Sequence, residues 1–250
     1  FSNVIGYIHL KLRNFPKARE YFTNHLLQSQ KAGNVYTEGH ALYDLGDLAI
    51  AQEKYDTALI LFTEAKNKFL SAKNLSDSQR HERTGYVSNK LAQCWKLKGD
   101  PSKAMQIIQA SLDVTKYPTS VNEYDKAEYF INGGDIYNRL KKPDSALTLL
   151  QQGLTIAGKI GHRELKRDAY EQMAIAYSLK KIYDSAFIYQ TRFSKLKDAI
   201  LNDINRDEIY QRDAALQIER QQRVQAVALQ RQKLWRNIII AVAVLLLISV

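Results

Sequence analysis

The chain contains five histidines and one cysteine, the side chains best suited to metal binding and nucleophilic chemistry. No histidine lies in an HExxH or Cys/His metal-binding pattern. A single thiol can form neither an internal disulfide nor a cysteine-based zinc site. The sequence therefore predicts no metal site, no cofactor and no catalytic centre in this chain. The six residues are His9, His25, His40, His81, His162 and Cys94.

Glycine-rich phosphate loops of the GxGxxG and GxxxxGK[ST] types do not occur in the sequence. Gly133–Asp135 lies within a helix-packing pattern, which argues against a nucleotide site there. His81–Arg83 is followed by Thr84–Tyr86, which lacks the hydrophobic and proline residues of a phospho-accepting histidine box. The net charge of +10 is spread along the chain without an arginine-rich tract, so we expect no nucleic-acid binding.

Few residues in the chain interrupt helices, because glycine occurs 11 times and proline 4 times in 250 residues. This composition favours helix, and we expect an all-α protein. Turns are predicted at Asn14–Pro16, Lys98–Pro101 and Lys141–Asp144. Helices are expected near residues 1–12, 16–32, 36–52, 55–73, 77–98, 102–116, 122–140, 144–160, 163–180 and 184–198.

One pattern of small and bulky side chains recurs five times and predicts the architecture. In its strongest copy, Gly46 on one helix and Ala58 on the next allow close approach, and Phe62 is the bulky residue. Each pair of helices is a hairpin that cannot bury its apolar face alone. The five copies are Ile5-Gly6, His9, Phe15, Ala18, Phe22; Leu45-Gly46, Ala49, Tyr55, Ala58, Phe62, Ala65; Leu91-Ala92, Trp95, Pro101, Ala104, Ile108; Gly133-Gly134, Tyr137, Pro143, Ala146, Leu150; and Met173-Ala174, Tyr177, Tyr183, Ala186, with Gln190 in the bulky position.

This order of residues resembles the tetratricopeptide repeat (TPR) over about residues 1–200. The second-helix alanines fall at residues 18, 58, 104, 146 and 186, so their spacings are 40, 46, 42 and 40 residues. The standard TPR period is about 34 residues, and the chain therefore resembles the long-helix variants of the family. The usual tryptophan at the head of the first helix is missing. The resemblance implies a superhelical solenoid of about five long hairpins over residues 1–198.

A solenoid of this kind presents the first helix of each pair on a concave face, where we expect a protein or peptide ligand. Asparagine, tyrosine and aspartate suit an extended peptide, although they would equally suit a groove that is merely soluble. Asp47 and Asp135 oppose an anionic ligand, so a basic or neutral peptide fits better than a terminal carboxylate. The candidate residues are Tyr7, Tyr43, Asp47, Asn89, Lys90, Gln93, Asn132, Asp135 and Glu171, together with Asn3.

The last thirteen residues, Ile238–Val250, read IIIAVAVLLLISV and differ from the rest of the chain. A membrane-spanning helix needs about 20 apolar residues. Residues 237–250 are therefore predicted to begin a span that continues beyond this sequence, and a buried helix of a soluble domain is the alternative. The residues just before the run suit a lipid headgroup layer: Trp235, Arg231, Lys233 and Arg236.

Residues 199–236 contain neither glycine nor proline and are predicted to form a helical spacer. A heptad frame places four apolar residues among nine seam positions, which is a weak coiled-coil signal. We expect a homodimer through the spacer only where other parts of the protein hold two chains together, and a solvated spacer is the alternative. The apolar seam residues are Ile209, Leu216, Val227 and Leu234.

Repeats, spacer and apolar run together resemble the sensory half of bacterial membrane sensor histidine kinases that contain TPRs. The resemblance implies a ligand-binding array whose conformational change reaches an output domain outside this sequence, provided that the ligand prefers one state. The alternative is a membrane-tethered TPR scaffold that assembles partners without signalling. The resemblance places the protein in the bacterial inner membrane with periplasmic repeats, whereas the basic residues before the run favour a cytoplasmic array.

Overall fold

A computed structural model of the chain describes residues 2–115, 121–203 and 206, and all regular structure within them is helical. The all-α prediction is confirmed for this part of the chain. Two units are distinguished, Phe1–Lys197 and Asp198–Val250, and the repeats lie in the former. The helices are α1 (Ser2–Lys11), α2 (Phe15–Lys31), α3 (Val35–Ala51), α4 (Tyr55–Ser71), α5 (Asp77–Leu97), α6 (Pro101–Val114), α7 (Glu123–Arg139), α8 (Pro143–Lys159), α9 (Arg163–Leu179) and a further helix over 183–203.

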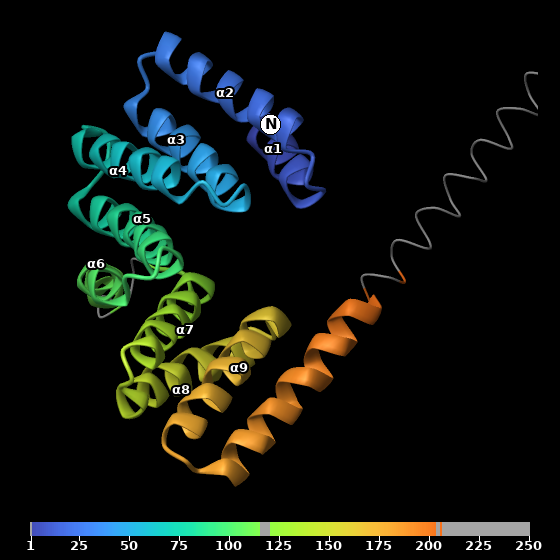
Figure 1. Ribbon diagram of the computed structural model, residues 1–250. Coiled ribbons are helices and arrows are strands. Elements are labelled where there is room, and N and C mark those ends of the chain that lie inside the picture. The colour runs from blue at the N-terminus through green and yellow to red at the C-terminus, as the bar shows by residue number, and fades with distance from the viewer. Residues whose placement is uncertain (1, 116–120, 204–205, 207–250) are drawn as a thin grey trace, which may run out of the picture. The chain divides into compact units, whose positions relative to one another are not determined.

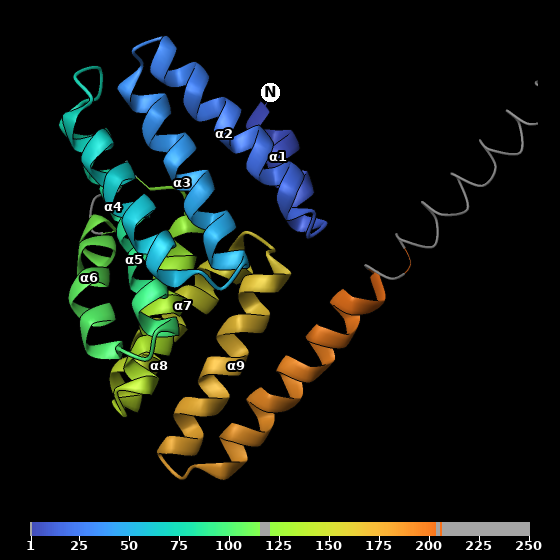
Figure 2. The same cartoon turned by 45° about the horizontal axis from the view of Figure 1, so that its top comes forward.

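Consecutive helices pair as antiparallel hairpins, α1 with α2, α3 with α4, α5 with α6 and α7 with α8 (Figures 1 and 2). The second helix of each of these hairpins packs on the first helix of the next hairpin. The predicted helix boundaries agree with the structure to within two residues at all but one end. The helix expected to end at residue 198 continues to residue 203, because no glycine or proline interrupts it.

The small residues of the repeat pattern lie where the hairpins are most tightly packed. Ala18, Ala58, Ala104 and Ala146 on the second helices are all 0% exposed. At Gly46 of α3, a Cβ atom would lie only 2.6 Å from Cε1 of Phe62 on α4. The predicted role of these small side chains in close helix approach is confirmed, and the core of the unit runs through these contacts.

The turn inside each hairpin has the same left-handed residue after the first helix. Its φ angle is 54° at Arg13, 59° at Glu53, 85° at Gly99, 57° at Lys141 and 60° at Lys181. The residue that follows donates its N–H to a carbonyl five residues back, as Asn14 does to His9 at 2.8 Å. This is the hydrogen bond of a Schellman motif, which ends a helix and reverses the chain.

Side-chain caps define where several helices begin. Asp100 accepts a hydrogen bond from the backbone N–H of Lys103 at 2.9 Å, as expected for the start of α6. Ser76 and Gln79 form a reciprocal capping box at the start of α5. These caps fix the first residues of α5 and α6.

The predicted spacer and membrane run lie outside the described residues, apart from 199–203 and 206. In the described part of the chain, no helix is both long enough and apolar enough to cross a membrane.

Candidate functional site

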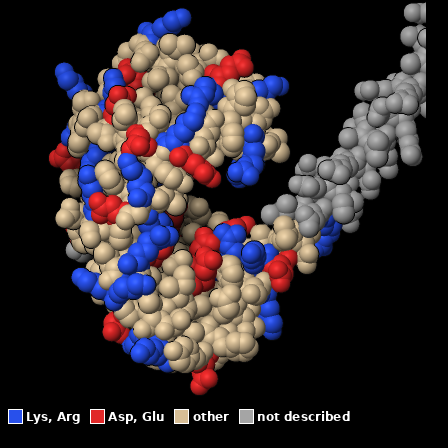
Figure 3. Space-filling view, viewed as in Figure 1, with Lys and Arg blue, Asp and Glu red and all other residues tan. Residues whose placement is uncertain are grey.

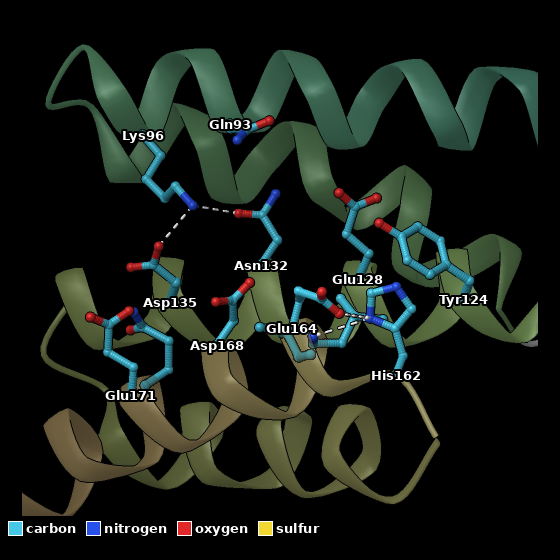
Figure 4. Close-up of a pocket in the computed structure, with 13 residues that line it drawn as sticks. Gln93, Lys96, Tyr124, Glu128, Asn132, Asp135, His162, Glu164, Asp168 and Glu171 are labelled. Carbon is cyan, nitrogen blue, oxygen red and sulfur yellow. Dashed lines mark hydrogen bonds and ion pairs between the residues drawn. The ribbon is translucent and has the colours of Figure 1, made fainter. Parts of the chain in front are cut away.

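A pocket of about 240 Å³ opens between α5, α7 and α9, the first helices of three successive hairpins (Figure 4). Ile131 of α7 and Leu165 of α9 form its apolar part. The other lining residues that Figure 4 labels are polar, and they project from all three helices or from the residue before α9. They are Gln93, Lys96, Tyr124, Glu128, Asn132, Asp135, His162, Glu164, Asp168 and Glu171.

Acidic side chains line both the α7 wall and the α9 wall of this pocket. Figure 3 shows acidic side chains gathered near the start of α9, with basic side chains next to them. Negative charge on two facing walls raises the local concentration of cations, most strongly in a cleft with low-dielectric walls. The five carboxylates are Glu128 and Asp135 on α7 and Glu164, Asp168 and Glu171 on α9.

Lys96 of α5 is the cation at the upper edge of the pocket. Its Nζ lies 2.7 Å from Oδ2 of Asp135 and donates a hydrogen bond of 2.7 Å to Oδ1 of Asn132. Asn132 in turn donates to Oδ1 of Asn89 at 2.8 Å. Lys96 is therefore paired with α7 and forms no ion pair with the carboxylates of α9 that line the pocket.

Two of the five carboxylates form no direct ion pair, although Glu128 is near enough to Lys90 of α5 to raise the pKa of that lysine. Within the described part of the chain, neither Glu128 nor Glu171 has a Lys, Arg or His nitrogen within 4.0 Å. Asp168 pairs with its neighbour Arg167 at 2.5 Å, and Glu164 lies 3.3 Å from His162. Both unpaired glutamates are half-buried, so a ligand cation would find them partly desolvated, where charge interactions are stronger.

Tyr124 supplies an aromatic surface at the end of the pocket. Its ring centroid lies 4.9 Å from that of His162 in an edge-to-face arrangement, and 42% of the residue is exposed. An exposed aromatic face beside carboxylates is suited to the flat guanidinium group of arginine.

A second polar cluster joins the earlier first helices. Lys90 of α5 lies 3.1 Å from Oδ1 of Asp47 on α3, and the hydroxyl of Tyr7 on α1 donates to Asp47 at 3.1 Å and to Asp44 at 2.9 Å. Burial alone would lower the pKa of Lys90, but the carboxylates of Asp47 and Glu128 raise it above its ordinary value. Lys90 therefore stays charged and holds α3 against α5.

Asp44 is the buried acid of this cluster. Burial raises its pKa from 3.8 to about 7, and the nearby Asp47 raises it as well, while the hydrogen bond from Tyr7 opposes both. Nδ1 of His25 on α2 lies 3.5 Å from the other carboxylate oxygen, and burial lowers the pKa of this histidine. The charge of this cluster therefore changes near neutral pH.

The structure separates the nine predicted site residues into three groups. Gln93, Asn132, Asp135 and Glu171 line the pocket together. The cluster of α1, α3 and α5 contains the next three, which are bound to one another or to Asp44: Tyr7, Asp47 and Lys90. The last two, Tyr43 and Asn89, are each only 2% exposed and position their neighbours from the interior.

The sequence prediction omits nine of the thirteen residues that line the pocket, and three of the nine are Lys96, Glu128 and Asp168. Helical spacing could have indicated two of them. Glu128 lies four residues before Asn132 on one helix face, and Asp168 lies three residues before Glu171. The position of Lys96 at the pocket depends on how α5 stacks on α7, which no spacing within one helix determines.

The described residues include no group of three His, Cys, Asp or Glu side chains arranged to hold a metal ion. The thiol of Cys94 is buried, and burial raises its pKa to about 12. A buried, protonated thiol packs as a small apolar group and is a poor nucleophile.

No family model and no curated protein sequence matches the chain. Among solved structures, it is similar to the TPR-like repeats of a kinesin-light-chain protein of Podospora anserina, with a TM-score of 0.60 and 13% identity over 80% of this chain and 95% of that chain. It is also similar to BtubC of P. vanneervenii, with a TM-score of 0.64 and 16% identity over 80% of this chain and 79% of that chain. The fold is that of TPR-like helical repeat proteins.

Proposed function

We propose that the repeat unit binds a protein or peptide ligand along the face formed by the first helices, and that the ligand is basic. The observation that carries this proposal is the pocket between α5, α7 and α9, whose two facing walls are acidic. Glu128 and Glu171, which form no direct ion pair, would each attract a lysine or arginine side chain of the ligand (Figure 4). The exposed ring of Tyr124 would stack on an arginine.

The arrangement of charge along the first helices supports this proposal. Lys90 of α5 is paired with Asp47 of α3, and Lys96 of α5 is paired with Asp135 of α7. Between α7 and α9 no ion pair crosses the pocket among the described residues. A cationic side chain of a ligand would supply the missing positive charge between α7 and α9.

A direct test measures binding of a fluorescein-labelled eleven-residue peptide of alanine and glycine with one central arginine. The same peptide with central glutamine is the comparison, and the full chain is used in mild detergent. We expect the arginine peptide to bind at least tenfold more tightly, which corresponds to about 1.4 kcal/mol. Its affinity should fall as salt rises, because screening weakens charge attraction.

Charge-neutral variants locate the site. The double variant Glu128→Gln and Glu171→Gln should lower affinity for the arginine peptide at least fivefold. A matched control, Glu20→Gln with Glu64→Gln, removes the same charge from exposed residues of α2 and α4 and should leave affinity within twofold. Equal binding of both peptides, or equal effects of both double variants, would contradict the proposal.

The finer proposal is that this chain is the sensory region of a membrane-anchored signalling protein. It is supported by the apolar run at 238–250 and the uninterrupted helical sequence before it. Residues 1–198 would be the sensor, 199–236 the spacer and 237–250 the start of the membrane helix, with the sensor in the periplasm of a bacterium. A membrane-tethered scaffold without signalling is the alternative.

Insertion of two glycines between Gln221 and Gln222 distinguishes these two proposals, because it breaks a helix that must transmit a conformational change. Signalling by a fusion of this chain to a reporter kinase should be lost while affinity for the arginine peptide stays unchanged. Signalling that survives the insertion would exclude transmission through a rigid helix. Peptide binding is measured separately, so the ligand proposal stands or falls on its own.

A further inference from the structure

The last hairpin, formed by α9 and the helix that begins at residue 183, leaves uncovered a face that every earlier hairpin buries. Ala18, Ala58, Ala104 and Ala146 are fully buried, and each belongs to a core cluster that includes a buried residue of the first helix of the next hairpin. Ala186 occupies the same repeat position on the last helix and is only half-buried. Large apolar side chains beside it are also exposed, namely Tyr183 at 66%, Phe187 at 73% and Ile188 at 49%.

This face contains a groove of about 430 Å³ between α9 and residues 183–197. Ala174, Ser178 and Leu179 of α9 form one side, and Ala186, Phe187 and Gln190 form the other. The described residues that line the groove are all uncharged, and Figure 3 shows mainly uncharged atoms over this part of the last hairpin.

The preceding hairpin shows what such a groove holds. Asn138 and Ala146 lie 40 residues before Ser178 and Ala186 and occupy the matching positions on α7 and α8. There, α9 packs on α8, and Asn138 donates a hydrogen bond of 2.9 Å to the backbone carbonyl of Gln172 on α9. The groove of the last hairpin therefore corresponds to a surface that packs against a helix in the preceding hairpin.

The described continuation of the chain does not return a helix to this groove. The second helices α2, α4 and α8 each have 17 residues and are followed by a turn. The last helix runs without a turn from residue 183 to residue 203. At the point where a new hairpin would begin, the chain is still helical.

We propose that a second copy of this chain occupies the groove, in a two-fold dimer through the last hairpin. The face is self-complementary, because the projecting ring of Phe187 stands beside the hollow that would receive the same ring of the partner. A two-fold interface needs this property, since each copy presents the same surface. Aromatic side chains that fill a pocket on the partner supply most of the affinity in such interfaces. The proposal does not depend on the peptide-binding pocket.

The test is the mass of the full chain in mild detergent, measured by sedimentation equilibrium between 1 and 100 µM. The native chain should be a dimer in the upper part of this range. Phe187→Glu should weaken dimerisation at least thirtyfold, because it places a charge in an apolar groove on both copies. Since this side chain is mostly exposed, the helical circular dichroism of the variant should be unchanged.

Ile60→Glu is the matched control, because Ile60 is 61% exposed on α4, in a different hairpin. This variant should dimerise like the native chain. A cysteine at Gln190 should form a disulfide-linked dimer on mild oxidation, whereas a cysteine at the exposed Gln151 of α8 should not, and native Cys94 is buried. A native chain that is monomeric at 100 µM, or a Phe187→Glu variant that dimerises as tightly as the native chain, overturns the proposal.

Discussion

Nζ of Lys90 on α5 lies 3.1 Å from Oδ1 of Asp47 on α3, so an ion pair joins the first helices of two successive hairpins. The side chains of Lys90 and Asp47 are only 18% and 15% exposed. A charge pair with so little solvent around it depends on both partners, since the loss of one leaves the other desolvated and unpaired. The pair therefore fixes the relative position of two repeats through their first helices.

Lys90→Met should lower the free energy of unfolding by about 2–3 kcal/mol, because Asp47 then keeps only the hydrogen bond from Tyr7. Urea unfolding of the single variants Lys90→Met and Asp47→Asn and of the double variant gives the coupling energy. We expect the double variant to be less destabilised than the sum of the two single variants by about 1–2 kcal/mol. Strict additivity would mean that the ion pair contributes nothing to stability.

Gly46 provides a test of the close helix approach that the repeat pattern requires. Gly46→Ala should destabilise the protein by about 1–3 kcal/mol, because its Cβ would stand 2.6 Å from the ring of fully buried Phe62. Gly158 of α8 is the control, since a Cβ there meets nothing within 4 Å. Gly158→Ala should stabilise by about 0.5–1 kcal/mol through helix propensity. Thermal unfolding of both variants should show shifts of opposite sign.

The helix pairing could be predicted from sequence because it depends on side-chain size at fixed local spacing. Gly46, Ala58 and Phe62 lie within one hairpin, and their sizes alone determine how closely α3 and α4 approach. The left-handed turn residues Glu53 and Lys141 carry no such signal in their residue types. Their position in the repeat indicates the left-handed conformation, because Gly99 occupies the same position in the third hairpin.

The candidate site was less predictable because it combines residues from different repeats. Asn89 is polar and lies on a first helix, yet it is buried because Asn132, 43 residues later, donates a hydrogen bond to its amide oxygen. Whether Lys96 neutralises an acid of α7 or of α9 depends on the stacking of the hairpins. Sequence spacing within one helix cannot predict which of the two helices Lys96 pairs with. Because Lys96 pairs with α7, Glu171 of α9 is left without an ion pair.

Asp44 should make the stability of the protein depend on pH between about 4 and 7. Burial raises its pKa to about 7 from an ordinary value of 3.8, so the folded chain binds this proton more tightly than the unfolded chain does. The stabilisation is complete below about pH 4 and is lost as pH rises through about 7. At 1.36 kcal/mol per pKa unit, its upper limit is about 4 kcal/mol.

Asp44→Asn removes this titration and keeps an oxygen that accepts the hydrogen bond from Tyr7. Urea unfolding should show the variant about 2–3 kcal/mol more stable than the native chain at pH 8.5, and nearly equal to it at pH 4. His25 and Asp47 also face this carboxylate, so Asp184→Asn, at an exposed residue of the last hairpin, is the control for general charge effects. A stability difference that is the same at both pH values would show that Asp44 does not titrate in this range.

Lys96 gives the sharpest test of the pocket, because its removal should strengthen ligand binding while the removal of Glu128 and Glu171 weakens it. Lys96→Met leaves Asp135 with Arg139 at 3.0 Å as its remaining cation and makes the pocket more negative by one charge. Removing a positive charge at the edge of the pocket should favour a bound cation by about 1 kcal/mol, the order of magnitude of a solvent-screened charge interaction. The arginine peptide should therefore bind about threefold to tenfold more tightly at low salt, and the gain should disappear at high salt.

Lys31→Met at the end of α2 removes the same charge outside the pocket and should change affinity by less than twofold. If Lys96→Met weakens binding, Lys96 contacts the ligand or supports the shape of the pocket, and the electrostatic account of this site is wrong.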